Sequence, residues 1–402
     1  ERAGAGVALG GGAAALAGVS AAVAGAAACD AEKAPEGEGK SLTSGFISDE
    51  SKKLSYFKYE RQLRSGAKPE KIFEYFASKE NENGDPMMTA MDLMRSVVPV
   101  FQPTGSGSLR SGSLKGEPNT PARGRDVGSR STLFEMFDYD KDGMLSFTEY
   151  IVFRTLLAVP VEYINATFRL LDTDNSESLS NAEFMNMIQM LRNYWQPEGK
   201  SAGRVTGSYS RSPDMKAPKG VGAGILDKLF GKNRRKELSL KEFDTFVKLI
   251  KTELTIMEFK HYDLDKDGKL SPKDFAMSLI AAADLSTIPE LVARVQKIDW
   301  GPEDRSKFIN QKDFEEVAKM RHMIEKMRFV VTMYHAVDKD SFTRDELRDT
   351  AWRVCRTKLS DAVLDVFVKL FPREGEEVDK AQFFSVLKKR VVIHAASRRD
   401  AR

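Results

Sequence analysis

The sequence predicts an all-α protein of repeated helix-loop-helix units in two lobes, preceded by a small N-terminal domain. Two observations predict this class. Acidic loops of about twelve residues recur from residue 138 onward, and apolar residues at helical spacing flank them. The length of 402 residues, of which 41% are apolar and 30% charged, is enough for two or three domains with cores of their own.

The stretch 138–149, called loop one, reads Asp-Tyr-Asp-Lys-Asp-Gly-Met-Leu-Ser-Phe-Thr-Glu. This is the pattern of a complete EF-hand loop, which offers oxygen atoms at alternate positions to a calcium ion that takes about six to eight of them. Gly143 stands at the sharp turn, where a side chain is costly, so a merely acidic solvated turn is disfavoured. The predicted ligands, the fourth through its carbonyl and the fifth often through water, are Asp138, Asp140, Asp142, Met144, Ser146 and Glu149.

The stretch 172–183, loop two, repeats the pattern with one departure. Glu177 stands where glycine is expected, and a non-glycine residue at positive φ costs about 1 kcal/mol. Because only three carboxylates remain among the ligands, we expect calcium binding weaker than in loop one. The alternative is a unit that folds without metal as the pairing partner of the first. The predicted ligands, the fourth through its carbonyl, are Asp172, Asp174, Ser176, Ser178 and Glu183.

The stretch 231–242, loop three, keeps the apolar Leu238 and the terminal Glu242. Arg235 and Lys236, however, place positive charge where a cation would lie. We therefore expect loop three to bind no calcium and to pair with the loop that follows it, because EF-hand loops share a short two-stranded contact.

That following stretch, 263–274 or loop four, again has glycine at the turn. Its last position is Asp274, one methylene shorter than the usual glutamate. A shorter carboxylate that reaches the ion through one oxygen favours six-coordinate Mg²⁺ over Ca²⁺, so the identity of the ion stays open. The predicted ligands, the fourth through its carbonyl, are Asp263, Asp265, Asp267, Lys269, Ser271 and Asp274.

Three further loops lack a ligand set and are expected to be structural. Loop five lies around 307–310 and loop six around 338–342, while loop seven, 372–382, is one residue short and ends in Gln382. We place the first lobe at 131–286, with loops one to four, and the second lobe at 287–392.

Outside the repeats the composition changes along the chain. Residues 3–29 are uncharged and rich in Ala and Gly, and a weak membrane anchor, a processed leader and a linker all stay open for them. The remaining expectations are a leader and flexible linker at 1–50, a basic N-terminal domain without metal ligands at 51–103, disordered segments at 104–130 and 196–224, and a basic tail at 393–402.

The formal net charge of +3 indicates an acidic partner surface or an anionic membrane surface as the binding partner, without choosing between them. We expect no nucleic-acid binding and no enzymatic activity, because the sequence has no basic-aromatic module, phosphate loop, zinc cluster or nucleophile motif. Cys355 is expected to be buried, and an intermolecular disulfide through Cys29 stays open.

Several stretches outside the acidic positions carry a family resemblance: 59–64 (Tyr-Glu-Arg-Gln-Leu-Arg), 69–77, 92–99, 145–151 and 229–231. With them, the chain from about residue 56 to residue 390 resembles the mitochondrial calcium uptake proteins, the EF-hand gatekeepers of the mitochondrial calcium uniporter. Loops one and two, which both look complete, make it more similar to the plant and algal branch. The degraded loop seven and the well-formed loop four depart from the family pattern.

The resemblance implies a calcium-sensing regulatory subunit in the mitochondrial intermembrane space, associated with the inner membrane. Such a subunit restrains uptake through the uniporter pore subunit at resting calcium, and calcium relieves the block. The resemblance also implies that Arg64 and Arg95 face the acidic channel entrance, the alternative being a solvated basic helix face. A homodimer or a heterodimer with a related EF-hand protein stays open, as does a calcium-dependent adaptor or buffer without a channel partner.

Overall fold

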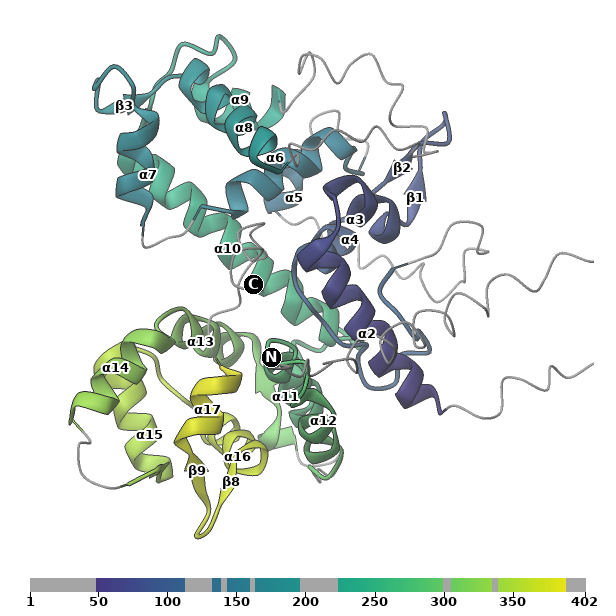
Figure 1. Cartoon of the computed structure of the whole chain (residues 1–402), viewed down its shortest axis with the longest axis vertical. Coiled ribbons are helices and arrows are strands. Elements are labelled where there is room, and N and C mark those ends of the chain that lie inside the picture. The colour runs from purple at the N-terminus through teal and green to yellow at the C-terminus, as the bar shows by residue number, and fades with distance from the viewer. Residues whose placement is uncertain are drawn as a thin grey trace, which may run out of the picture. The chain divides into compact units, whose positions relative to one another are not determined.

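The computed structural model describes residues 48–112, 132–138, 143–159, 163–195, 223–298, 305–334 and 339–387 (Figure 1). Apart from Ser48, these residues belong to one compact unit, Asp49–Arg402. Helices dominate and each strand has only two or three residues, which confirms the all-α class. The expected leader up to residue 47, the insert 196–222 and the tail 393–402 lie outside the described residues.

The N-terminal region, residues 48–112, consists of three helices, a two-stranded hairpin and the segment that follows them. The second helix begins at Pro69, whose fixed φ suits the first helical position. Thr89 caps the third helix: its hydroxyl accepts from the backbone N–H of Asp92, and the Asp92 carboxylate accepts from the backbone N–H of Thr89. The elements are α2 (Asp49–Gly66), α3 (Pro69–Phe76), β1 (Lys79–Glu80), β2 (Pro86–Met87) and α4 (Ala90–Val97).

The N-terminal region supplies the pairing partner of loop one. Met88, directly before the cap of α4, exchanges two backbone hydrogen bonds with Leu145, at 2.9 and 2.8 Å. The segment from α3 to α4 is therefore a further helix-loop-helix unit, which the sequence analysis treated as a separate domain. Loop two is not the pairing partner of loop one.

Loop three pairs with loop two, and the expectation that it pairs with loop four is wrong. Leu238 is opposite Leu179 in the antiparallel pair β4–β3. The reason is the helix α10, whose 23 unbroken residues span about 35 Å and separate loops three and four. The elements of this part are α5 (Thr132–Phe137), α6 (Phe147–Leu157), α7 (Ile164–Leu171), β3 (Ser178–Leu179), α8 (Asn181–Trp195), α9 (Ala223–Phe230), β4 (Leu238–Ser239) and α10 (Leu240–Tyr262).

Loop four pairs with loop five, across the lobe boundary expected between residues 286 and 287. Leu270 is opposite Ile309 in the pair β5–β6. Since two paired loops form one unit, loop four sits with the C-terminal repeats and not in a lobe that ends at residue 286. The elements are β5 (Lys269–Leu270), α11 (Pro272–Ile280), α12 (Ile288–Gln296), the 3₁₀ turn η5 (Arg305–Lys307), β6 (Ile309–Asn310) and α13 (Gln311–His322).

Loops six and seven form the last pair. Phe342 is opposite Val378, which places Phe371 at the first position of loop seven and gives that loop the ordinary length, not one residue fewer. A helix C-cap with φ of 55° at Arg356 follows the π-helical turn η6. The elements are α14 (Ile324–Tyr334), β7 (Ser341–Phe342), α15 (Arg344–Thr350), η6 (Ala351–Cys355), α16 (Asp361–Leu370), β8 (Pro372–Arg373), β9 (Glu377–Asp379) and α17 (Lys380–Val386).

The first part of the segment expected to be disordered, residues 104–112, is packed against the N-terminal helices. The backbone N–H groups of Ser111 and Gly112 donate to the buried carboxylate of Glu60 at 2.7 and 3.0 Å. A side chain at Gly112 would collide with the ring of Tyr75, since a Cβ there would lie 1.9 Å from it. The buried carboxylate thus orders this segment, and its continuation at 113–130 lies outside the described residues.

Apolar side chains from all of these units join one continuous core that includes the stacked rings of Phe57 and Phe101, with centroids 3.7 Å apart. Cys355 is buried, as predicted. Within the described ranges, no helix is both long and apolar enough to cross a bilayer.

Candidate metal centres

In loop one the two ends of the predicted ligand set lie on fixed elements. Asp138 follows α5, and its Oδ2 accepts from the backbone N–H of Gly143 at 3.0 Å. Gly143 has a φ of 76°, the conformation that glycine adopts at little cost. The Oε2 of Glu149 accepts from the backbone N–H and the hydroxyl of Ser146, both at 2.8 Å. Met144 is half-buried between them, whereas Asp140 and Asp142 lie outside the described residues.

In loop two the structure brings three predicted ligands together. Carboxylate oxygens of Asp172, Asp174 and Glu183 lie within 4.8 Å of one another. Glu177 has a φ of 60°, so it adopts the turn that glycine provides in loop one. Its backbone N–H donates to Asp172 Oδ2 at 3.0 Å. The loop therefore has the EF-hand shape without glycine at its turn.

The last ligand of loop two is held ready by its own loop. Thr173 and Ser180 each donate a backbone N–H and a hydroxyl to Glu183, at 2.8 to 2.9 Å. Burial opposes ionisation, but these four hydrogen bonds outweigh it and lower the pKa of Glu183 to about 2. The Ser176 hydroxyl donates to the carbonyl of Ser178 at 3.1 Å, which places these two predicted oxygen ligands side by side.

Loop four holds a compact group of carboxylates. Oxygens of Asp263, Asp265 and Asp267 lie within 4.8 Å of one another, and Gly268 has a φ of 77°. Burial and the facing carboxylates of Asp265 and Asp267 raise the pKa of Asp263. Its Oδ1 is buried and has no hydrogen-bond partner within the described part of the chain. These residues fit a divalent cation, which would neutralise the converging carboxylates and give Asp263 Oδ1 a partner.

The last predicted ligand of loop four is held away from this group. Asp274 does not belong to the group of three carboxylates. Its Oδ2 accepts from the Ser271 hydroxyl at 2.6 Å, and its Oδ1 accepts from the backbone N–H of Thr104 at 2.7 Å. The backbone N–H of Lys269, whose carbonyl is a predicted ligand, donates to Asp267 at 2.9 Å.

Loop three carries its own cation. The ammonium group of Lys236 lies 2.8 Å from Oε1 of Glu242, the residue at the last loop position. Together with hydrogen bonds from Ser239, this contact lowers the pKa of Glu242 to about 2. A divalent ion in loop three would have to displace the ammonium group, so this geometry leaves no place for calcium.

In loops six and seven the residue at the last position is also bound by a basic side chain, which the sequence analysis missed. Lys339 lies 3.1 Å from Glu346 at the end of loop six, and 3.1 Å from Glu377 of loop seven. Gln382 at the end of loop seven accepts from Arg294 at 2.5 Å. Lys339 occupies the fifth position of loop six, where an EF-hand carries a ligand, and this substitution is the sequence signal that would have found the first of these contacts.

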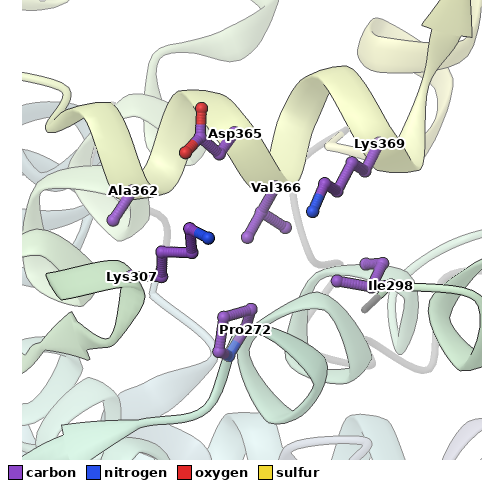
Figure 2. A pocket seen from close by; sticks show the side chains of 7 residues that line it. All are labelled: Pro272, Ile298, Lys307, Ala362, Asp365, Val366 and Lys369. Carbon is purple, nitrogen blue, oxygen red and sulfur yellow. The ribbon is translucent and has the colours of Figure 1, made fainter. Parts of the chain in front are cut away.

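A small hollow lies between Pro272 at the start of α11 and one face of α16 (Figure 2). The amino groups of Lys307 and Lys369 point toward it, and the carboxylate of Asp365 points away (Figure 2). Asp365 forms an ion pair with Arg344. The hollow leaves only about 10 Å³ for water-sized molecules, far below the usual range of about 300–1,000 Å³ for ligand sites, and we assign no function to it.

The structure corrects the expectation that Arg64 faces a partner. Arg64 is only 1% exposed, and its guanidinium lies 3.4 Å from Glu60, 2.7 Å from the carbonyl of Arg95 and over the ring of Phe76. A side chain buried in this way cannot reach an acidic surface of another protein. Arg95 lies 3.8 Å from Asp92 with 24% of its side chain exposed, so its role toward a partner stays a proposal.

Comparisons with known proteins agree with this geometry. A family model described as "EF hand" matches residues 130–153 and 256–279, which contain loops one and four. The crystal structure of EFHA2 in its calcium-binding state superimposes with a TM-score of 0.52 at 19% identity, covering 81% of this chain and all of that one. The apo structure of the mitochondrial calcium uniporter protein MICU2 gives 0.51 at 20% identity, covering 80% and 88%. At these identities the likeness shows the shared fold.

Curated relatives show the family. The mitochondrial calcium uptake protein 1 of Rattus norvegicus is 25% identical over 90% of this chain and 74% of its own length. The mitochondrial calcium uptake protein of Arabidopsis thaliana is 34% identical over 351 residues, which cover 87% of this chain and 68% of that protein. The chain described here therefore belongs to the family of mitochondrial calcium uptake proteins.

Proposed function

We propose that this chain is a calcium-sensing regulatory subunit that gates calcium uptake through the mitochondrial calcium uniporter. The observation that carries the proposal is the convergence of three carboxylates in loop two and of three in loop four, within a chain of the calcium uptake family. Carboxylate and carbonyl oxygens at this spacing are the ligands that calcium prefers. Asp138 and Glu149 of loop one would serve the same ion chemistry.

Calcium acts in this proposal by changing the relative stability of two arrangements of the helices. Binding to a sensor loop rotates its flanking helices, and the ion shifts the population by its difference in affinity for the two arrangements. The chain restrains the pore at resting calcium, and the calcium-bound arrangement relieves the block. Loop four, whose last ligand is the short Asp274, takes Mg²⁺ or Ca²⁺.

The proposed partner is the pore subunit of the uniporter, and the proposed place is the intermembrane space at the inner membrane surface. The relatives are mitochondrial calcium uptake proteins, and this supports mitochondrial calcium uptake as the setting. Arg95 is the remaining candidate for contact with an acidic channel entrance. A homodimer, or a heterodimer with a related EF-hand protein, is the proposed assembly.

Uptake by isolated mitochondria tests the proposal. Deleting the chain should raise calcium uptake at resting calcium, and the wild-type chain should restore the restraint. A Glu149→Gln, Glu183→Gln double variant should restrain uptake but fail to release it when calcium rises. Glu242→Gln is the matched control, since it changes the same position in a loop that holds Lys236 instead of an ion. Unchanged uptake in a complete deletion would refute the proposal.

A calcium buffer or adaptor without a channel partner is the second candidate. The observation that favours it is the hydrogen bonding within loop two, which holds its turn and its last ligand in position. A preformed loop can bind calcium with little rearrangement. Co-purification with the pore subunit at low calcium separates the two functions, because a buffer would leave the pore subunit unbound.

A further inference from the structure

Asp274 of loop four is bound to the N-terminal region, in contrast to the last ligand of loop two. The four hydrogen bonds that Glu183 accepts from Thr173 and Ser180 all come from its own loop. Asp274 Oδ1 instead accepts from the backbone N–H of Thr104, 170 positions earlier in the chain, at 2.7 Å. The Asp274 carboxylate is not one of the three that lie within 4.8 Å of one another in this loop, which are those of Asp263, Asp265 and Asp267.

Thr104 is presented by a tight turn. The backbone N–H of Ser106 donates to the carbonyl of Pro103 at 3.0 Å, and Gly105 has a φ of 81°. Residues 103–106 form a type II turn, because only its third residue, Gly105, has a positive φ. Thr104 is the second residue of this turn. The turn fixes the direction of the Thr104 N–H, and Thr104 itself stands where proline is favoured.

The same N-terminal region holds both helices of loop four. At the end of α10, the Tyr262 hydroxyl accepts from the backbone N–H of Phe101 at 3.1 Å, and His261 Nε2 lies 2.9 Å from the carbonyl of Phe101. At the end of α11, the guanidinium of Arg61 contacts the carbonyl groups of residues 281–283. A movement of α11 relative to α10 therefore strains or releases contacts with the N-terminal region.

We propose that the Thr104 N–H and a divalent cation compete for Asp274, so that occupancy of loop four is transmitted to the N-terminal region through the turn 103–106. The proposal rests on the cation site proposed above for loop four. When the ion takes Asp274 as a ligand, Oδ1 leaves Thr104 and the turn loses its anchor. By linkage, removing the Thr104 N–H must strengthen cation binding by the factor with which the cation weakens this bond.

Thr104→Pro in the full-length chain tests the competition, because proline lacks the N–H and suits this position of the turn. A hydrogen bond to a charged group is strong enough that we expect cation binding to loop four to tighten about tenfold. Thr104→Ala is the matched control: it keeps the N–H and should bind as the wild type does. The probe is Mg²⁺, and then Ca²⁺, in calorimetric titrations, with the loop-four share defined as the part that Asp263→Ala removes, because the first loop position requires a carboxylate.

Hydrogen exchange of residues 101–106 gives the reciprocal readout. Mg²⁺ or Ca²⁺ should speed exchange of the Thr104 amide in the wild type, and this effect should vanish in Asp263→Ala. If Asp263→Ala removes no binding, loop four takes no cation and both the site and the competition are wrong. If loop four binds the ion but Thr104→Pro and Thr104→Ala bind equally tightly, the site stands and the competition is refuted.

Discussion

Arg64→Ala should lower the free energy of unfolding by about 3 kcal/mol, because it leaves the charge of Glu60 buried without its ion-pair partner. Removing one member of a buried pair costs about 3–5 kcal/mol in general. Glu60 keeps three donors in the variant, from Tyr75 at 3.2 Å, Ser111 at 2.7 Å and Gly112 at 3.0 Å. These donors still solvate the carboxylate, so we expect the lower end of that range.

Urea unfolding followed by circular dichroism measures the effect. Lys68→Ala, an exposed basic residue just after α2, is the control and should change stability by less than about 0.5 kcal/mol. Arg64→Met combined with Glu60→Gln should recover at least half of the loss, because no charge is then left buried. A loss below about 1 kcal/mol for Arg64→Ala would refute the buried-pair reasoning and return Arg64 to the candidate partner-binding residues.

Glu149→Gln should weaken calcium binding by at least about tenfold in calorimetry, and more than Glu183→Gln does, because loop one has the complete ligand pattern; the reverse order would mean that loop two is the better site. Glu177→Gly should raise stability by no more than about 1 kcal/mol, since the strain at positive φ is relieved but glycine adds freedom to the unfolded chain. It should leave calcium affinity nearly unchanged, because Glu177 already adopts the positive φ that glycine would provide; a large gain in affinity would contradict this. Burial raises the pKa of the Cys355 thiol to about 11, so at pH 8 iodoacetamide should modify it at least about a hundredfold more slowly than in urea, as peptide mapping would show; equal rates would mean that the thiol is exposed.

The helices and the calcium loops could be predicted because their signals are local. Ser146 and Glu149 form a capping box within four consecutive residues, and Pro69 marks the start of α3. The pairing of the loops could not be predicted, because each contact is only two residues long and any apolar residue at the eighth loop position suits it. The unbroken run from Leu240 to Tyr262 was the one available sign that loops three and four are too far apart.

Arg64 and Asp274 both contact residues distant in the chain, and those contacts cannot be read from a local pattern. Arg64 lies on the same stripe of α2 as the buried Phe57 and Glu60, so its spacing did indicate an inward-facing position. Nothing in the sequence indicates that Thr104 meets Asp274, because that contact requires the folded N-terminal region.

The loops differ in which groups of the protein bind the residue at their last position. Glu149 and Glu183 accept hydrogen bonds from their own loops, so an ion meets ligands that are already oriented. Glu242 and Glu346 are held by lysines, and an ion would have to displace a bound charge. Asp274 accepts one hydrogen bond from Ser271 of its own loop and another from Thr104 of the N-terminal region, so loop four is the one among these in which ion binding would disturb a distant part of the chain. If the chain reports calcium or magnesium to a partner through its N-terminal region, loop four has the contact that can carry the report.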